Sequence, residues 1–384
     1  MTDTYDVIVI GLGAMGSAAL DQLARRGARV LGLERFGIPH EQGSSGGDTR
    51  LTRKAYFEHP DYVPLLERAY QNWEDLEARS GERVLFKTGA VYIGRPDGEL
   101  VRGTLASAEA HSLACERLDT RDLARHSPPL QLPDGYAALW DADGGFVLAG
   151  RAIRLFCERG LEGGAHVRTG EAVLALRDDG SGVEVTTDRA RYRADHAIVA
   201  TGSWTADLLE RLRIHLTVTR QALFWLWPEP AAAFELDAFP CWAAELDGAP
   251  GLFYGFPRLP ASLAATLGVK VAHHAPGPVA LPGALAPADA REFEASRAKV
   301  ESVFRTPLGP VVATKTCMYT SSPDQHFIID RYPDLRSATY ACGFSGHGFK
   351  FASVIGEALA DLALDGNTRL PIEFLRYARL TRAR

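Results

Sequence analysis

The sequence predicts a mixed α/β fold in which two domains are interleaved along the chain, one built from strand–helix units and one on a mainly antiparallel sheet. Three observations indicate this. The chain starts with a strand, a glycine-rich turn, a helix and a strand; β-like segments dominate its middle; and helix returns at its end. This order assigns residues 1–85, 145–215 and 320–384 to the first domain, and residues 86–144 and 216–319 to the second.

The composition is that of a globular protein with a sizeable core. The 384 residues are 46% hydrophobic and 23% charged, and the formal net charge is −6. Because Lys and Arg are not in excess, phosphates would not be neutralised, and we expect no nucleic-acid partner. No apolar run is long enough to span a bilayer, and the start lacks the basic lead-in of a secretory signal, so we expect no membrane association.

The five cysteines are scattered along the chain and odd in number, and no Cys or His pair has the spacing of metal ligands. An ordinary cysteine of this kind is a small buried hydrophobic residue. We therefore expect no metal site and a reduced, cytoplasmic compartment.

The first element has the pattern of a Rossmann-type dinucleotide-binding unit. Residues 5–10 are apolar and β-branched, as in a strand buried on both faces, and residues 17–25 predict the following helix. In the turn between them, the first glycine permits the bend, the second lets the backbone approach a pyrophosphate, and the third lets the helix pack on the strand. A second strand at 28–34 ends in an acid placed for ribose hydroxyls. The predicted nucleotide-binding residues are Gly11, Gly13, Ala14, Met15, Gly16, Glu34 and Arg35.

The remaining elements follow from hydrophobic periodicity and β-branched content. Residues 258–290 are rich in Pro, Ala and Gly, and predict a surface excursion around a strand at 267–272. Further helices are expected at 62–82, 151–159, 289–303 and 351–364, and further strands at 89–93, 137–147, 167–185, 192–200 and 216–227.

A later segment bears on which dinucleotide is bound. Residues 195–204 form a strand that ends in the small-residue turn Ala200-Thr201-Gly202 and is followed by Trp204. Flavoproteins with two dinucleotide folds typically carry such a turn beside the nucleotide. The glycine motif alone leaves NAD and FAD open, and this turn favours FAD.

Three further blocks carry a family resemblance: GDTRLTR at 47–53, KTCMYT at 315–320 and GFSGHGFKF at 343–351. Together with the glycine motif, and in this order, they resemble the monomeric sarcosine oxidase and N-methyltryptophan oxidase family, within the D-amino-acid-oxidase-like flavoenzymes. The resemblance runs over residues 5–366 and is weak at 90–250. It implies FAD as the cofactor and a monomeric enzyme.

The resemblance also implies how FAD is held. Cys317, in the KTCMYT block, corresponds to the family's covalent attachment point, a thioether to the flavin 8α-methyl group, and a thiolate is the nucleophile that such a bond needs. The helix that follows Phe349 would offer its positive end to the flavin N1–C2 carbonyl. The other cofactor residues implied are Ser44, Ser45, Thr49, Arg50, Met318, Gly343, Phe344, Gly346, His347, Gly348 and Lys350.

Arg53 and Lys350 correspond to the family's clamp for the substrate carboxylate, which pairs a planar fork with a mobile point charge. Tyr319 and Tyr254 match tyrosines of the active site, and Tyr254 lies in the block FYGFP. Arg50 matches an arginine beside the flavin ring.

Lys270 resembles the family lysine that activates dioxygen, since a cation favours the electron transfer that forms superoxide. His274 follows it by four residues, as the family's histidine does. The implied reaction oxidises a secondary amine that carries a carboxylate. A hydride equivalent passes to flavin N5, water hydrolyses the imine, and dioxygen reoxidises the flavin to give hydrogen peroxide.

The sequence departs from the family in two places. Ser45 and Gly46 stand where relatives usually have two histidines, and residues 258–266 form a longer segment than the family has, which we expect beside the substrate pocket. A substrate other than sarcosine therefore stays open. So do three alternatives: an FAD dehydrogenase or oxidase of another subgroup that acts on an amino or imino acid, a non-catalytic flavin-binding subunit, and an NAD-dependent dehydrogenase.

Overall fold

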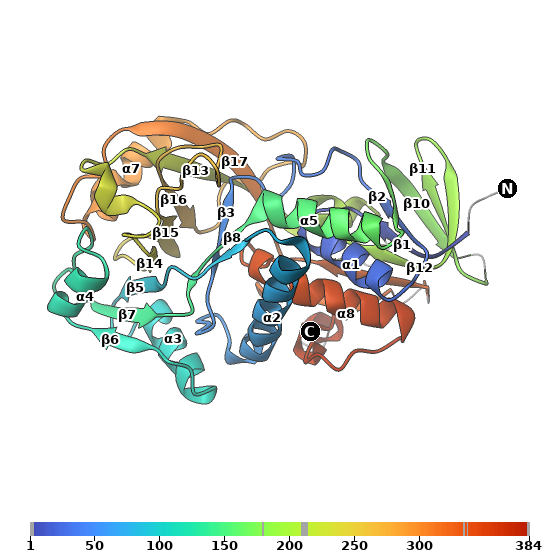
Figure 1. Ribbon diagram of the computed structural model, residues 1–384, viewed down its shortest axis with the longest axis horizontal. Helices are drawn as coiled ribbons and strands as arrows, with labels where there is room; N and C mark the ends of the chain where they lie inside the picture. The colour runs from blue at the N-terminus through green and yellow to red at the C-terminus, as the bar shows by residue number, and fades with distance from the viewer. Residues whose placement is uncertain (1–3, 179, 209–213, 333–334, 336, 382–384) are drawn as a thin grey trace.

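The computed structural model describes residues 4–178, 180–208, 214–332, 335 and 337–381. Within them, two eight-stranded sheets lie at opposite ends of the long axis of the molecule, and a three-stranded sheet lies between them (Figure 1). Helices pack on both large sheets. The predicted mixed α/β class is confirmed.

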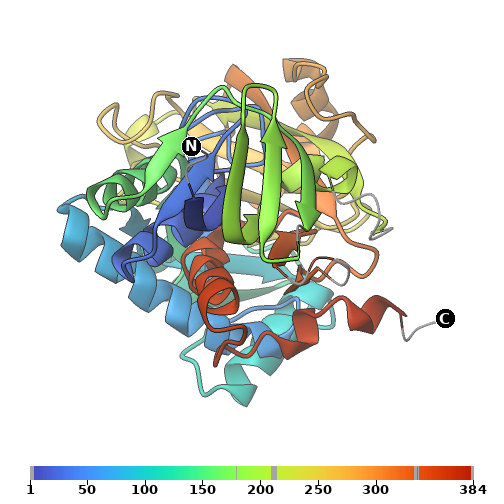
Figure 2. The ribbon, with the colours of Figure 1, turned by 90° about the vertical axis from the view of Figure 1, so that its right-hand side faces the viewer.

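The first large sheet places the opening strand of the chain near its centre. Its strands are β10 (Val173–Asp178), β11 (Val183–Thr187), β12 (Arg191–Val199), β1 (Thr4–Ile10), β2 (Val30–Leu33) and β9 (His166–Arg168) in spatial order, with β19 (Ala338–Cys342) beside β12 and β18 (Ile328–Arg331) beside β19. β1 pairs in parallel with β12 and β2, and Val7 to Ile10 are at most 2% exposed, as the apolar run predicts. β10, β11 and β12 form an antiparallel layer that faces the viewer in Figure 2.

The helices beside this sheet pack closely because small residues meet. α1 (Ala14–Arg25) lies against α5 (Ala149–Glu162) and α8 (Ala352–Leu364). A Cβ on Gly356 would come within 2.5 Å of the Ala18 Cβ, so α8 and α1 touch through backbone. α2 (Val63–Ser80) packs on α8, and Trp73 Nε1 donates to the Lys350 carbonyl at 3.0 Å. These contacts fix the start of α8 in place.

Among the described strands of the second large sheet, only β14 and β5 pair in parallel, so the prediction of a mainly antiparallel sheet is confirmed. Its strands in spatial order are β17 (Val311–Ser321), β13 (Thr217–Leu226), β16 (Val269–His274), β15 (Leu252–Phe256), β14 (Cys241–Ala244), β5 (Ala90–Gly94), β7 (Ala137–Asp141) and β6 (Glu116–Leu118). α7 (Ala290–Glu301) packs on β13 and β17. Trp242 and Phe304 meet at a ring distance of 5.2 Å in the core on this side.

The third sheet joins the two halves. Its strands are β3 (Thr49–Thr52), β8 (Gly145–Leu148) and β4 (Leu85–Phe86), all antiparallel. β3 and β8 run between the large sheets in Figure 1, so the block at residues 47–53 lies at the boundary between them. No helix within the described residues is both long and apolar enough to cross a membrane.

Several short elements were not anticipated from the sequence. The buried face of α3 includes Thr104 and Ser107, so its apolar stripe is too thin to stand out. The others are no longer than seven residues. These elements are α3 (Glu99–Ala110), α4 (Thr120–His126), α6 (Thr205–Leu208), α9 (Ala378–Thr381) and the 3-10 helices at Pro60–Tyr62, Gly202–Trp204, Ala231–Phe234, Phe349–Phe351 and Glu373–Leu375.

The excursion at 258–290 contains a strand two residues later than predicted, β16. Its first part, 258–266, was expected beside the active-site pocket. Leu259 and Ala264 instead bury themselves in a hydrophobic cluster, and Arg151 donates to the Ser262 carbonyl at 3.1 Å. No residue of this segment lines the two cavities described below.

Candidate functional site

A large cavity of about 340 Å³ opens at the carboxyl ends of β1, β2 and β12. Ligands of α/β sheets bind at this edge, where the N-termini of helices also point. Most of the predicted cofactor residues line it: Gly11, Gly13, Ala14, Met15, Glu34, Arg35, Ser44, Ser45, Arg50, Ala200, Thr201, Gly202, Trp204, Met318, Gly343, Phe344, Gly346 and Gly348.

The three glycines of the motif each meet a different requirement. Gly11 has φ +86°, and a Cβ there would lie 2.7 Å from the Ala200 carbonyl oxygen. A Cβ on Gly16 would lie 1.8 Å from the Gly11 oxygen, so only glycine allows this helix to approach the turn. Gly13 faces open space in the cavity wall, and as N-cap of α1 it makes no side-chain capping bond. The first N–H groups of α1 are thus directed at the cavity, as an anion site requires.

Glu34 is the acid at the end of β2. Its carboxylate accepts the Leu12 N–H at 2.8 Å and the Phe36 N–H at 2.9 Å, and His40 lies 3.5 Å away. Burial alone would raise the pKa of Glu34, but the hydrogen bonds from His40, Phe36 and Leu12 outweigh it and lower the pKa. The group is therefore an ionised acceptor inside the cavity, suited to ribose hydroxyls.

Three aromatic rings line the large cavity beside one another: Phe36, His40 and Trp204. The Arg35 guanidinium lies 5.6 Å from the Trp204 ring, and Phe36 lies 5.5 Å from it and 5.0 Å from His40. Phe36 and His40 belong to no motif, so the sequence alone does not reveal them as lining residues. The other lining residues that the sequence does not reveal on this side include Pro39, Glu171, Leu174 and Leu208.

A second, smaller cavity of about 40 Å³ shares a wall with the first. Four residues line both: Arg50, Tyr319, Gly346 and Phe349. The rest of the small cavity is lined by Leu51, Arg53, Phe57, Glu58, Leu252, Tyr254, His274, His347 and Lys350. Every predicted substrate-binding residue, and two of the predicted catalytic residues besides Arg50, therefore meet here.

Charge in the small cavity comes from one acid, Glu58, and three cations: Arg50 on the shared wall and the buried Arg53 and Lys350. Nη2 of Arg53 lies 2.7 Å from both carboxylate oxygens of Glu58. Burial would lower the pKa of Arg53, but the Glu58 charge outweighs it and keeps the guanidinium protonated. In Glu58, the charge of Arg53 likewise outweighs burial and lowers the pKa to about 2. Burial and the neighbouring Arg53 lower the pKa of Lys350 to about 7.

The Arg53 side chain is held on three sides. Its guanidinium carbon lies 4.8 Å from the Tyr56 ring and 4.7 Å from the Phe57 ring, so the two aromatic residues flank the cation. Glu58 takes one edge. Nε is buried without a hydrogen-bond partner among the described residues, so a donor stays available to a ligand. The sequence could have flagged Glu58 as an acid close to Arg53, but spacing alone does not reveal the turn that pairs them.

The Arg50 side chain holds the segment at 44–49, which leads into β3, through hydrogen bonds to its backbone. Its guanidinium donates to the carbonyls of Thr49 at 2.8 Å, Ser44 at 2.7 Å and Gly46 at 2.6 Å. Ser45 and Gly46 therefore lie in a segment that Arg50 holds beside the large cavity.

Tyr319 and His274 form one wall of the small cavity. A hydrogen bond joins the Tyr319 hydroxyl and His274 Nδ1 at 3.2 Å, and Tyr254 also hydrogen-bonds Tyr319. Burial lowers the pKa of His274 to about 4, and burial raises the pKa of both tyrosines. All three side chains are thus neutral at neutral pH.

Four predicted site residues line neither cavity. They are the packing glycine Gly16, and Thr49, Lys270 and Cys317. Lys270 Nζ donates to the Gly47 carbonyl at 2.6 Å, to the Thr49 carbonyl at 2.9 Å and to Thr49 Oγ1 at 3.3 Å. Burial lowers the pKa of Lys270 well below its usual value, and the charge of Arg50 adds to this. Cys317 is 3% exposed beside Trp225. Burial raises its pKa, while Arg50 and Lys270 act in the opposite direction.

His347 and Lys350, predicted among the cofactor residues, line the small cavity instead of the large one. Lys350 follows a turn that contains Gly346, which lines both cavities, and Gly348, which lines the large one. The single block GFSGHGFKF therefore supplies the large cavity with its glycines and the small one with a histidine and a cation.

Comparison with known proteins agrees with this geometry. A family model for FAD dependent oxidoreductases matches residues 6–362. The chain is 39% identical to monomeric sarcosine oxidase of Streptomyces avermitilis, over 100% of both chains. It is 33% identical to N-methyl-L-tryptophan oxidase of Escherichia coli, over 98% of this chain and 99% of that one.

Solved structures with the same fold give the same picture. NikD, an unusual amino acid oxidase essential for nikkomycin biosynthesis, superposes with a TM-score of 0.85 at 30% identity, over 98% of both chains. L-Proline dehydrogenase from P. horikoshii superposes with a TM-score of 0.83 over 100% of this chain and 99% of that one. At 20% identity, that second likeness is one of fold alone.

Proposed function

Because the chain belongs to the FAD-dependent oxidoreductase family, together with sarcosine oxidases and N-methyltryptophan oxidases, we propose that it oxidises the secondary amine of an N-methyl, N-alkyl or cyclic amino acid with dioxygen as acceptor. The family resemblance found in the sequence is confirmed, as is the amine-oxidase type of the enzyme. The substrate, the acceptor and the residue roles that follow are our proposals.

One observation carries the proposal: two buried cations line a small cavity that shares a wall with the dinucleotide cavity. Arg53 and Lys350 are 4% exposed, and a single acid, Glu58, faces them. An excess of buried positive charge is costly unless an anion completes it. A substrate carboxylate supplies that anion, and the free Nε of Arg53 and the Lys350 ammonium are donors for it.

The large cavity fits FAD on features of this chain alone. The uncapped start of α1 would hold the pyrophosphate, Glu34 would accept hydrogen bonds from the ribose hydroxyls, and the glycines at 343–348 would let the backbone approach the flavin ring. Bound FAD takes up the two electrons of the amine oxidation and passes them to dioxygen, which gives hydrogen peroxide. The protein excludes water and orients the donor carbon over the flavin, and this positioning is worth several kcal/mol.

The protein also selects the protonation state of the amine. A secondary amine must be neutral to give up a hydride equivalent, and the cations Arg50, Arg53 and Lys350 disfavour a protonated amine between them. His274 and Tyr319 are neutral and joined by a hydrogen bond, so they orient the amine without a charge of their own. Tyr254 completes this wall.

We further propose a thioether between Cys317 and the flavin 8α-methyl group, and a role for Lys270 in dioxygen activation. Two cations, Arg50 and Lys270, oppose the effect of burial on the Cys317 pKa, which favours the thiolate that attachment needs. Lys270 is fixed by three oxygen acceptors in the block that leads to Arg50.

Denaturation followed by filtration tests the attachment. Yellow colour should stay with the wild-type protein and pass the filter in a Cys317→Ser variant. The control is a Cys342→Ser variant, which should keep its colour. Cys342 is also buried, but it lies in β19 of the first sheet, whereas Cys317 lies in β17 of the second. Colour that leaves the wild-type protein contradicts the thioether and leaves FAD binding intact.

The other expectations from the sequence stay proposals. They are the division into a cofactor domain and a substrate domain at the stated boundaries, a monomer, and a reduced cytoplasmic compartment. The termini at 1–3 and 382–384 of the first domain lie outside the described residues.

A peroxide-coupled screen of N-methyl amino acids, proline and pipecolate tests the substrate class. We expect turnover of at least one of them under air. Reduction of the flavin without peroxide would identify a dehydrogenase of another subgroup instead. Activity on none of them, with FAD bound, would favour a non-catalytic flavin-binding subunit.

A further inference from the structure

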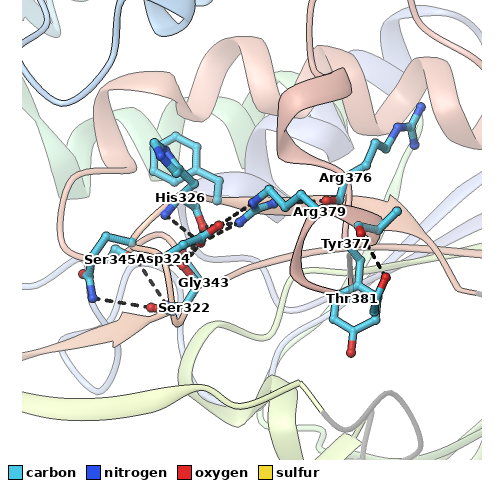
Figure 3. A network of polar contacts seen from close by, with 12 residues as sticks. Ser322, Asp324, His326, Gly343, Ser345, Arg376, Tyr377, Arg379 and Thr381 are labelled. Atoms are coloured by element: carbon cyan, nitrogen blue, oxygen red, sulfur yellow. Dashed lines mark hydrogen bonds and ion pairs between the residues drawn. The ribbon is translucent and has the colours of Figure 1, made fainter. Parts of the chain in front are cut away.

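The last described helix, α9, holds the turn between β17 of the second sheet and β18 of the first sheet through one arginine. Arg379 Nε and Nη2 donate to the two carboxylate oxygens of Asp324 at 2.7 and 2.9 Å, and Nη2 also donates to the His326 carbonyl at 2.9 Å (Figure 3). This is the two-pronged geometry that makes arginine–carboxylate pairs strong. The Arg379 side chain is 19% exposed, so solvent screens the pair only in part.

The turn that Arg379 grips, residues 322–326, is tied to the loop that lines both cavities. The Ser322 N–H donates to Ser345 Oγ at 3.3 Å, and the Ser345 N–H donates to the Thr320 carbonyl at 2.9 Å. Gln325 and Ser345 have φ of 63° and 49°, a left-handed conformation that side chains other than glycine rarely adopt. Such backbone persists where the surroundings hold it, and it clusters at functional sites. Here Arg379, Ser322 and Ser345 hold the backbone of Gln325 and Ser345 in this conformation.

The turn also fixes the orientation of a buried histidine. The Gln325 carbonyl accepts a hydrogen bond from His347 Nε2 at 3.0 Å, so the proton of the neutral imidazole lies on Nε2. Nδ1 is then the acceptor for the Tyr56 hydroxyl at 2.5 Å. The His347 carbonyl in turn accepts from Lys350 Nζ at 2.9 Å.

The two buried cations of the small cavity, Arg53 and Lys350, therefore contact groups that His347 positions. The Tyr56 ring lies 4.8 Å from the Arg53 guanidinium, and Lys350 Nζ lies 5.1 Å from the same ring. We propose that Arg379 is a positioning residue of the substrate-carboxylate site: by holding the turn at 322–326 it fixes His347, and through His347 it fixes Tyr56 and Lys350. This inference rests on the proposed function of the small cavity as a carboxylate site.

The same segment offers a matched control. Arg376 Nη1 donates to Asp330 Oδ1 at 3.2 Å, and the Tyr377 N–H donates to Asp330 Oδ2 at 3.0 Å. These bonds fasten the C-terminal segment to β18, away from the turn that carries Gln325. A variant at Arg376 loosens the segment, whereas a variant at Arg379 also releases the turn.

The test uses the flavin-loaded enzymes Arg379→Ala, Arg379→Lys and Arg376→Ala. Methoxyacetate, a carboxylate without an amine, is titrated against the flavin absorbance, and kcat and KM are measured for the best carboxylate-bearing substrate. In Arg379→Ala we expect the Kd and KM to rise about tenfold, as for a residue that acts through others, while kcat changes little. Arg379→Lys should recover part of the loss. Arg376→Ala should bind as the wild type does.

Three results overturn the inference: wild-type affinity for methoxyacetate in Arg379→Ala, an equal loss in Arg376→Ala, or a loss of kcat with unchanged KM. If Arg379→Ala gives no folded protein, Asp324→Asn decides by the same measurements, because it weakens the same pair and keeps its shape. A wild-type enzyme that binds no carboxylate contradicts the proposed function and this inference together. Binding that the wild type and Arg379→Ala share contradicts this inference alone.

Discussion

The two cavities differ in how the chain builds them. The large one is framed by short motifs in which neighbouring residues act together, such as the glycines at 11–16 and the turn at 200–202. The small one gathers single side chains from β3, the segment after it, β15, β16, β17 and the loop before α8. Cofactor binding therefore depends mainly on local backbone geometry. Substrate binding depends on long-range packing and on the balance of buried charge.

The sharpest way to break this comparison is to disturb the local backbone. In Gly16→Ala the added Cβ would lie 1.8 Å from the Gly11 carbonyl oxygen, and backbone cannot move aside as a flexible side chain can. Overpacking usually costs about 1–3 kcal/mol, and here the cost falls on the turn that faces the pyrophosphate. We expect a protein with little or no bound flavin, measured as the ratio of flavin to protein absorbance.

The matched control for that change is Gly37→Ala in the loop after β2. A Cβ on Gly37 has nothing within 4 Å, so flavin content should stay at the wild-type level. Normal flavin content in Gly16→Ala would mean that the turn relaxes, and that local backbone geometry is not what limits cofactor binding.

The same difference explains what could be predicted from the sequence. The glycine motif fixes φ, helix direction and cavity side within a few residues, so Gly11, Gly13, Gly16 and Glu34 could be placed with their reasons. The block at 343–351 was placed by the family resemblance rather than by a backbone rule of this kind. In the second sheet, β5, β7, β13 and β16 were predicted from their apolar and β-branched residues. β17 is also rich in β-branched residues but was not predicted, and neither were the short strands β6, β14 and β15.

The partners of the clamp could not be predicted. Glu58 pairs with Arg53 only because the chain turns back after β3, and Tyr56 meets His347 although 291 positions separate them in the chain. These contacts depend on how the segments pack, which no short motif encodes. Likewise, the sequence marks Lys270 as a cation but not its three oxygen acceptors, two of which are backbone carbonyls.

Charge balance is what should matter in the small cavity. Glu58→Gln leaves the buried Arg53 guanidinium without its counter-charge, and we expect the free energy of unfolding to fall by about 3 kcal/mol, the lower end of the cost of losing one partner of a buried ion pair. Chemical unfolding of the flavin-loaded protein measures this. Saturating methoxyacetate should recover part of the loss, since its carboxylate takes the place of the missing charge.

Glu74→Gln is the control for that variant, because Glu74 pairs with Lys87 at the exposed surface. Surface pairs are worth about 0–1 kcal/mol, so its stability should hardly change. An equally small loss in Glu58→Gln would show that the cavity is wet enough to screen Arg53.

The pH dependence of carboxylate binding separates Lys350 from Arg53. Lys350 has a pKa lowered to about 7 by burial and by Arg53, and it attracts a carboxylate only when protonated. Methoxyacetate affinity should therefore be full below about pH 7 and fall as the pH rises above it, by at most about tenfold per pH unit. His274 and His347 have pKa values of about 4 and 3, so they stay neutral across this range.

In Lys350→Met the affinity should be weaker and should no longer fall above pH 7. An unchanged slope in that variant would assign the titration to another group. Arg53 cannot be that group, since Glu58 keeps it protonated.

The smallest effect concerns the size of the substrate, and it asks whether long-range packing also sets specificity. Phe57 lines the small cavity and covers one face of Arg53 at 4.7 Å. Phe57→Ala opens space beside the clamp and removes one cation–π contact, worth about 0.5–1 kcal/mol where the site is partly solvated. We expect kcat/KM for sarcosine to fall about two- to fivefold. For a bulkier N-methyl amino acid, such as N-methylphenylalanine, the loss should be smaller or reversed.

Phe57→Tyr is the control, because it keeps the ring over Arg53, and it should keep the wild-type ratio of kcat/KM for the two substrates. If Phe57→Ala lowers kcat/KM for both substrates equally, Phe57 supports Arg53 without limiting the substrate, and the wall that sets size must be sought at Leu51 or Leu252 on the other strands of the cavity.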